Sequence, residues 1–133
     1  MSRTALITGG VTGIGAAISK LLKAKGYTVV ANYFGNDEDA KAFAEETGIQ
    51  VRAWNVADFD ACQTEVAAIA AEFGAIDVLV NNAGITRDAT LHKMTQEQWK
   101  SVIEVDLGGC FNMCRAVIEE MRERRFGRIV NIS

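Results

Sequence analysis

The sequence predicts one α/β domain built on a doubly wound parallel sheet of about five strands, Rossmann-like in outline. Short β-branched runs alternate along the chain with stretches whose apolar residues recur at helical spacing. Several of the runs are apolar almost throughout, which is typical of parallel strands covered on both faces. This alternation implies right-handed crossovers with helices on both sides of the sheet. The expected domain spans residues 1–133, because no linker rich in serine or glycine divides them.

The expected strands lie, in chain order, at residues 4–8, 27–32, 50–54, 76–81 and 128–132. The first and third helices are predicted by apolar side chains that recur on one face. These are Ile14, Ala17, Ile18, Leu21 and Leu22 in the first helix, and Cys62, Val66, Ile69, Ala70 and Phe73 in the third. The second helix is expected over residues 37–46, ending at Gly48, a residue that suits a left-handed cap.

The longest helical stretch begins at Thr95, an N-cap with Gln98 three residues further on, and continues to about Arg125 before Gly127. Gly108 and Gly109 predict a bend or a close helix contact within it. Its apolar residues cover more than the stripe that one sheet face can bury, so we expect residues 95–125 to form a homo-oligomer contact. These residues are Trp99, Val102, Ile103, Cys110, Phe111, Cys114, Val117, Ile118 and Met121.

Composition excludes several classes of function. The net charge of −3 comes without a basic tract, so we expect no nucleic-acid partner. The apolar runs are far shorter than the roughly 20 residues of a membrane span, so a cytoplasmic protein is expected. Cys62, Cys110 and Cys114 are odd in number and lack paired CxxC motifs. We therefore expect small buried hydrophobic residues, with no metal site and no disulfide framework.

A glycine-rich turn follows the first strand and opens into the first helix. Its glycines have the spacing G-x3-G-x-G, which lets the backbone turn sharply and approach a pyrophosphate at the helix N-terminus. A bare glycine triplet could equally be a structural turn, but its place in a βαβ unit predicts a dinucleotide site. The candidate residues here are Gly9, Gly10, Val11, Thr12, Gly13, Ile14 and Gly15.

The end of the second strand bears on the form of the dinucleotide. A carboxylate there would take the ribose hydroxyls and repel a 2′-phosphate. The sequence instead has Asn32 and Tyr33, candidate contacts themselves, and its first acid is Asp37. Because no carboxylate closes the strand to repel a phosphate, the residues favour NADP(H). No arginine stands ready to hold that phosphate, so NAD(H) stays open.

Three motifs in order resemble the classical short-chain dehydrogenase/reductase family over the whole chain. They are TGG-x-x-GIG at residues 8–15, Asn55-Val56 after the third strand, and NNAG at residues 81–84. Residues 81–88 and 126–133 are most similar to the acetoacetyl-CoA reductases and the related 3-oxoacyl-carrier-protein reductases of that family. ANYFGN at residues 31–36 and residues 92–94 favour the acetoacetyl-CoA group. The resemblance implies an oxidoreductase that reduces a 3-oxoacyl thioester with NADPH, in polyhydroxyalkanoate biosynthesis.

The resemblance also assigns site residues. It implies that Asn82, Ala83 and Gly84 lie against the ribose and nicotinamide side of the dinucleotide, while Asn55 and Val56 flank the adenine. From the residues alone, NNAG could merely cap the strand and turn the chain. Asp88 matches an aspartate near the substrate, although a solvated loop charge is an equal reading.

Two residues depart from the family pattern. Thr12 stands where many NADP-dependent members have an arginine. Asp106 matches the family asparagine that helps hold a water relay behind the catalytic lysine, which makes it a candidate catalytic residue. An ionised aspartate can accept from such a relay but cannot donate, so a structural acid is an equal reading.

The family's serine, tyrosine and lysine would follow the fifth strand, where this sequence stops. Ser133 matches the position just before that serine, and neither Tyr27 nor Tyr33 begins Tyr-x-x-x-Lys. His92 is expected to be a surface or loop residue. We therefore expect a domain truncated after strand five, incomplete relative to the family and inactive alone. The alternative is a non-catalytic module that binds nucleotide or assembles with itself.

Overall fold

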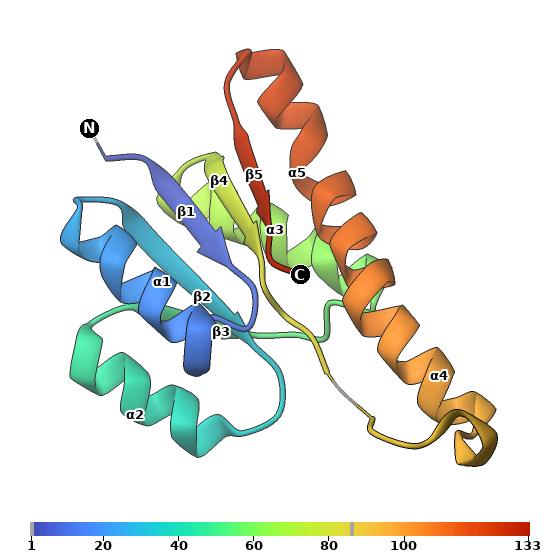
Figure 1. Ribbon diagram of the computed structural model, residues 1–133. Coiled ribbons are helices and arrows are strands. Elements are labelled where there is room, and N and C mark those ends of the chain that lie inside the picture. The colour runs from blue at the N-terminus through green and yellow to red at the C-terminus, as the bar shows by residue number, and fades with distance from the viewer. Residues whose placement is uncertain (1, 86) are drawn as a thin grey trace.

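The computed structural model describes residues 2–85 and 87–133, which form one parallel sheet between two layers of helices (Figure 1). The predicted doubly wound fold is confirmed, with each strand within one residue of its expected ends. The strands are β1 (Thr4–Ile7), β2 (Thr28–Tyr33), β3 (Gln50–Ala53), β4 (Ile76–Asn81) and β5 (Arg128–Asn131). The helices are α1 (Gly13–Ala24), α2 (Asp37–Thr47), α3 (Phe59–Phe73), η1 (Leu91–Lys93), α4 (Gln96–Val102), η2 (Ile103–Gly108) and α5 (Gly109–Arg124).

The strand order is β3-β2-β1-β4-β5, and every pair is parallel. From β1 the chain winds outward to β3, and it then returns to the other side of β1 to lay down β4 and β5. The direction of winding therefore reverses between β1 and β4. In open parallel sheets, ligands bind in the crevice outside the carboxyl ends of the strands at such a reversal.

The sheet is buried on both faces because successive side chains of a strand point in opposite directions. Leu6 and Leu79 point into a core that includes Val66 of α3 and Met113 of α5. Ala5, Ile7 and Val80 point the other way, into a core with Phe43 of α2 and Ile18 of α1. The near-continuous apolar runs of the sequence thus correspond to strands that are covered twice.

The helix expected over residues 95–125 is divided into three segments. Thr95 and Gln98 form the predicted capping box at its start, but the π-helix η2 lies between α4 and α5. Gly109 makes the close contact that its sequence suggested, because a Cβ there would lie 2.6 Å from Val56 Cγ2. The helix ends on the left-handed Arg125, with φ 56°, rather than at a glycine.

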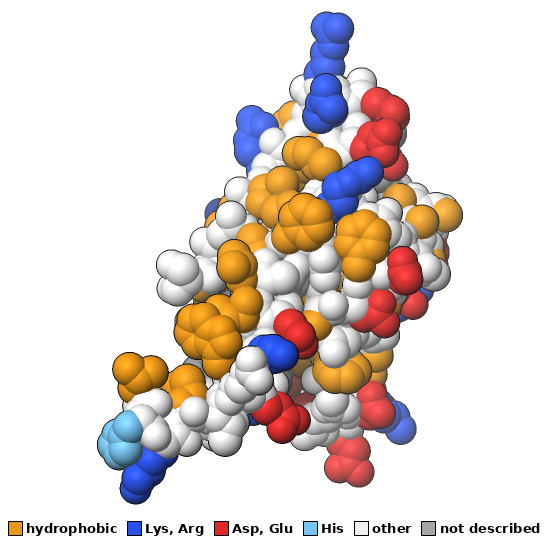
Figure 2. Space-filling model, turned by 90° about the vertical axis from the view of Figure 1, so that its right-hand side faces the viewer, with side chains coloured by type: hydrophobic (Ala, Val, Ile, Leu, Met, Phe, Trp, Pro, Cys, Tyr) orange, Lys and Arg blue, Asp and Glu red, His pale blue; other side chains and the backbone are white. Residues whose placement is uncertain are grey.

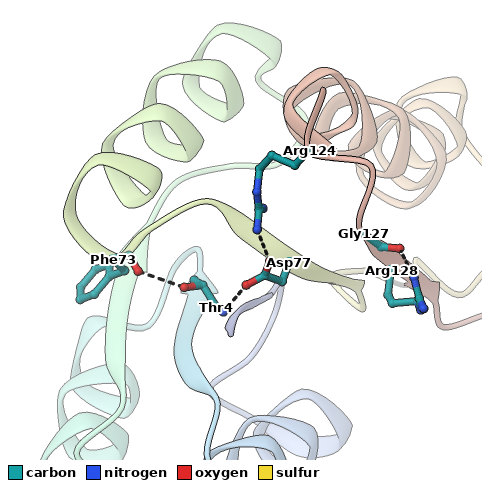
Figure 3. A network of polar contacts seen from close by, with 6 residues as sticks. All are labelled: Thr4, Phe73, Asp77, Arg124, Gly127 and Arg128. Carbon is teal, nitrogen blue, oxygen red and sulfur yellow. Dashed lines mark hydrogen bonds and ion pairs between the residues drawn. The ribbon is translucent and has the colours of Figure 1, made fainter. Parts of the chain in front are cut away.

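A polar network closes the amino end of the sheet (Figure 3). The Asp77 carboxylate accepts hydrogen bonds from the backbone N–H of Thr4 at 2.8 Å and from Arg124 at 2.6 Å. The Thr4 hydroxyl donates to the carbonyl oxygen of Phe73 at 3.0 Å. Burial alone would raise the pKa of Asp77, but the hydrogen bonds from Arg124 and Thr4 outweigh it and hold that pKa below its usual value.

Over residues 2–85 and 87–133, none of the helices combines the length and the apolar content that a bilayer span requires.

Candidate functional site

A cavity of about 600 Å³ opens at the carboxyl ends of β1, β2, β3 and β4, at the reversal point of the sheet. It is the place that the topology predicts for a ligand. Most of the candidate dinucleotide contacts line it, namely Gly9, Val11, Thr12, Asn32, Tyr33, Asn55, Val56, Ala83 and Gly84. Gly10, Gly13, Ile14, Gly15 and Asn82 do not line this cavity.

The glycine turn is built from two kinds of glycine. Gly10 and Gly15 face the protein, since a Cβ would lie 2.8 Å from the carbonyl oxygen of Ile7 at Gly10 and 2.0 Å from that of Gly9 at Gly15. Gly13 has φ 53° and nothing within 4 Å of the position of a Cβ. Gly10 and Gly15 therefore close the turn, while Gly13 keeps its outer side open.

The start of α1 differs from that of the other helices. Of the α-helices that follow a loop in the described residues, α2, α3 and α4 each begin with a side-chain N-cap. The capping side chains of Asn36, Asp58 and Thr95 each accept a hydrogen bond from a backbone N–H of the first turn. The N-cap Thr12 of α1 makes no such bond, and the first turn of α1 has no acidic residue. Backbone N–H groups at a helix start need an acceptor, and the helix dipole there favours an anion. The start of α1 is therefore chemically suited to a pyrophosphate.

Asn32 positions the glycine turn. Its side chain is 1% exposed. Its Oδ1 accepts from the backbone N–H of Gly9 at 3.2 Å, and its Nδ2 donates to the carbonyl oxygen of Trp54 at 2.9 Å. The side-chain amide thus joins the ends of β1, β2 and β3, so Asn32 borders the cavity while its polar atoms already have protein partners.

Thr8 is a structural member of the site that sequence reasoning missed. Its hydroxyl oxygen accepts hydrogen bonds from the backbone N–H groups of Asn82 at 3.0 Å and Ala83 at 2.9 Å. The side chain of Asn82 donates to the carbonyl oxygen of Gly9 at 3.2 Å. These bonds hold the segment after β4 against the glycine turn. The available signal was a hydroxyl residue directly before the first motif glycine.

The end of the cavity beside β2 is more acidic than the sequence reading expected. Asp39, from the first turn of α2, lines it together with Phe34 and Asn36. The hydroxyl of Tyr33 donates to Asp37 at 2.9 Å. That hydrogen bond, burial and the charge of Asp37 together raise the pKa of Tyr33. Asp39 was missed because it lies six residues after β2 and reaches the cavity through the turn into α2.

A second cavity of about 420 Å³ adjoins the first and shares Val56, Ala83 and Gly84 with it. Asn82 and Asp106 line it. The Asp106 carboxylate accepts from the backbone N–H of Ile85 at 2.8 Å, so it ties η2 to the segment after β4.

Two remaining candidates lie apart from these cavities. Asp88 is exposed in the loop after β4 and lines neither cavity, and His92 is exposed in η1.

The chain belongs to the short chain dehydrogenase family, whose profile matches residues 3–133. It is 61% identical over 133 residues to the acetoacetyl-CoA reductase of Paracoccus denitrificans, and 59% identical to that of Rhizobium meliloti (strain 1021). Each match covers 100% of this chain and 55% of the relative. The chain therefore spans about half the length of these relatives.

More distant similarities agree with that assignment. A 3-oxoacyl-[acyl-carrier-protein] reductase FabG of Staphylococcus aureus (strain N315) is 40% identical over 139 residues, with 100% of this chain and 56% of the relative covered. The crystal structure of a short-chain dehydrogenase from Streptomyces avermitilis superposes with a TM-score of 0.91 at 30% identity. That match covers 99% of this chain and 49% of the other.

Proposed function

We propose that residues 1–133 form a single domain that binds a nicotinamide dinucleotide. One observation carries the proposal: α1 begins without a side-chain cap, directly after an open glycine turn, at the reversal point of the sheet. The backbone N–H groups of residues 13–15 would hold the pyrophosphate. Asn55 and Val56 would flank the adenine, and residues 82–84 the nicotinamide side. The bound dinucleotide would supply hydride exchange with a carbonyl group.

NADP(H) is the proposed form. The strand β2 ends in Asn32 and Tyr33, and the carboxylate of Asp37 already accepts from the Tyr33 hydroxyl. Asp39 at the cavity rim supports NAD(H) instead, since its charge opposes a 2′-phosphate. Isothermal titration with NADPH and NADH separates the two. Tighter binding of NADPH is expected, and tighter binding of NADH would assign the discrimination to Asp39.

The parent activity we propose is reduction of a 3-oxoacyl thioester, such as acetoacetyl-CoA, by a polypeptide of the relatives' full length. The names of the relatives at 61% and 59% identity support this substrate class. Within the 133 residues neither tyrosine begins Tyr-x-x-x-Lys, so no proton donor of the family type is available. The 133-residue chain should therefore bind dinucleotide without oxidising NADPH when acetoacetyl-CoA is added. Turnover on the usual enzymatic scale of about 1 per second or more would contradict this.

A second candidate function is self-assembly without catalysis, favoured by the apolar face over α3, α4 and α5. Figure 2 shows hydrophobic side chains gathered on that side of the molecule. Trp99, Leu107 and Phe111 are 59%, 65% and 62% exposed, and the ring of Phe111 stacks on Phe59. Exposed apolar patches of this kind mark association surfaces.

Homodimers or larger assemblies are therefore proposed through the long helical segment. Light scattering on a size-exclusion column at tens of micromolar should give at least twice the monomer mass. Phe111→Asp should return it to the monomer mass, whereas the same substitution at Phe34, exposed on the far side of the cavity, should not. A monodisperse monomer for the unmodified chain would reject the proposal.

A further inference from the structure

Two of the cysteines share one hydrogen-bond donor at the carboxyl end of β4. The side-chain nitrogen of Asn81 lies 3.3 Å from Cys114 Sγ and 3.6 Å from Cys110 Sγ. The same nitrogen donates to Asn131 Oδ1 at 3.0 Å, and Cys110 Sγ lies 3.4 Å from that oxygen. Both sulfur atoms are therefore gathered beside one amide group, between α5 and the ends of β4 and β5.

The two thiols also share one face of α5. Residues four apart in a helix are neighbours on its surface. Cys110 and Cys114 are free and half-buried, and Cys110 lines the cavity of about 420 Å³. Cys62, in α3, is also free, but it is 0% exposed on the core side of that helix. In a single copy of the 133-residue chain, a reagent from solution can thus reach the pair, while the third thiol is enclosed.

We propose that Cys110 and Cys114 form a two-thiolate site for a soft, thiophilic centre, and that a trivalent arsenical of the arsenoxide type fits it. Thiolates are soft ligands that select soft centres over hard cations. With an arsenoxide, two As–S bonds form as the two bonds of the As=O group break. Both thiol protons leave on the oxygen as one molecule of water. Arsenic stays trivalent, so the step requires no oxidant or reductant.

Spacing on one helix face gives the pair its advantage over a single thiol. After the first As–S bond forms, the second thiol is held close by, so the second bond is intramolecular and the effective concentration is high. Asn81 would remain beside the two sulfur atoms and donate to them as thiolates, in the way that outer-shell groups orient metal ligands.

A raised pKa protects Cys110 from reagents that attack only thiolates. Burial and the neighbouring Cys114 raise the pKa of the Cys110 thiol, so it is mostly protonated at neutral pH. Reagents that attack only thiolates should therefore label it slowly. The pair should stay reduced and available to a centre that engages both sulfurs at once.

Intact-mass spectrometry with phenylarsine oxide tests the proposal on the 133-residue chain in an excess of glutathione. The unmodified chain and the matched control Cys62→Ser should each retain one adduct, with two fewer thiols titratable by a disulfide reagent. Cys110→Ser and Cys114→Ser should bind the arsenical at least about 100-fold more weakly, because each retains only one sulfur of the pair.

Three outcomes would overturn the proposal: no adduct on the unmodified chain, an equally strong adduct on Cys114→Ser, or loss of the adduct in Cys62→Ser with the fold intact. The fold of each variant is checked by its thermal transition. The thiol count on the unmodified chain requires no substitution, so it decides the matter even if a variant fails to fold. Neither readout involves nucleotide, so the result is separate from the proposed dinucleotide binding.

Discussion

The two ends of β1 use the same type of side chain in different ways. At the amino end, the hydroxyl of Thr4 donates one hydrogen bond, to the carbonyl oxygen of Phe73, within a network completed by Asp77 and Arg124. At the carboxyl end, the hydroxyl of Thr8 donates a longer hydrogen bond to the carbonyl oxygen of Val80 at 3.4 Å and also accepts two, from the backbone N–H groups of Asn82 and Ala83. Both threonines are 2% exposed, so the difference lies in what each one holds.

The two networks at the ends of β1 therefore have different roles, one in the stability of the fold and the other in ligand binding. The amino-end network ties two helices to the sheet, and the polar groups described there are paired with one another. The carboxyl-end network holds a loop beside a cavity, and the start of α1 next to it has no side-chain cap. Substitution of polar residues at the amino end should therefore lower the free energy of unfolding only. Substitution of those at the carboxyl end should lower both the free energy of unfolding and the affinity for dinucleotide.

The largest effect is expected for Gly13→Val. A branched side chain on the open side of the turn would occupy the space of the pyrophosphate, so calorimetry should detect no dinucleotide binding. Gly26→Val is the matched control, because Gly26 also has positive φ and nothing within 4 Å of its Cβ position, but lies between α1 and β2 away from the cavity. Equal affinity in the two variants would mean that the turn is not the phosphate site.

The second largest effect is expected for Thr8→Val, which should lower both the stability of the fold and the affinity for dinucleotide. Two backbone N–H groups lose their acceptor at a part-buried site, so the free energy of unfolding should fall by about 3 kcal/mol. The segment after β4 would also lose its tie to the glycine turn, which should weaken dinucleotide binding. Urea unfolding measures the first effect and titration the second. A variant that loses stability but binds normally would break the proposed link between them.

Asp77→Asn should lower the free energy of unfolding by about 2 kcal/mol, a value reduced because Arg124 is 37% exposed and partly screened by water. The pKa of Asp77 is lower in the folded state than its usual value. Its stabilising contribution is therefore complete above the unfolded pKa of about 3.9 and is lost as pH falls through the folded pKa.

Urea unfolding of the Asp77→Asn variant at pH 7 and near pH 3 measures this dependence. The variant should lose less stability than the unmodified chain over that interval. A parallel decline of the two proteins would exclude Asp77 as a source of acid sensitivity.

The smallest effect is expected for Thr4→Val. It removes one hydrogen bond to Phe73 and leaves the Thr4 backbone N–H on Asp77, so the free energy of unfolding should fall by about 1 kcal/mol. Dinucleotide affinity should not change. A loss of affinity as large as that of Thr8→Val would show that the two ends of β1 are not separable.

The strands could be predicted from the sequence because a strand that is buried on both faces is a short run of mostly apolar residues. Nearly continuous apolar runs such as residues 76–80, which Asp77 alone interrupts, can be recognised without knowledge of their neighbours. The glycine turn was also local, because its spacing and its place before a helix occur within eight residues. Both depend on short-range pattern, and both matched the structure in position.

The missed features depend on contacts between distant residues. Thr8 meets Asn82 across 74 positions of the chain, and no local pattern indicates that its hydroxyl accepts two bonds there. Asp39 reaches the cavity only because α2 begins close to the end of β2. Asp88 was a candidate from resemblance alone, and its side chain lies outside both cavities.

The π-helix η2 changes the angular phase of the long helix. In an uninterrupted α-helix, Trp99 and Phe111, twelve positions apart, would point about 120° away from each other. The wider π turn absorbs one extra residue, which turns the later part back by roughly 100° and leaves the two rings about 20° apart. Trp99 and Phe111 are therefore brought to one side of the long helical segment, and a deletion of one residue within 103–108 would turn Phe111 away from Trp99 by roughly 100° about the helix axis.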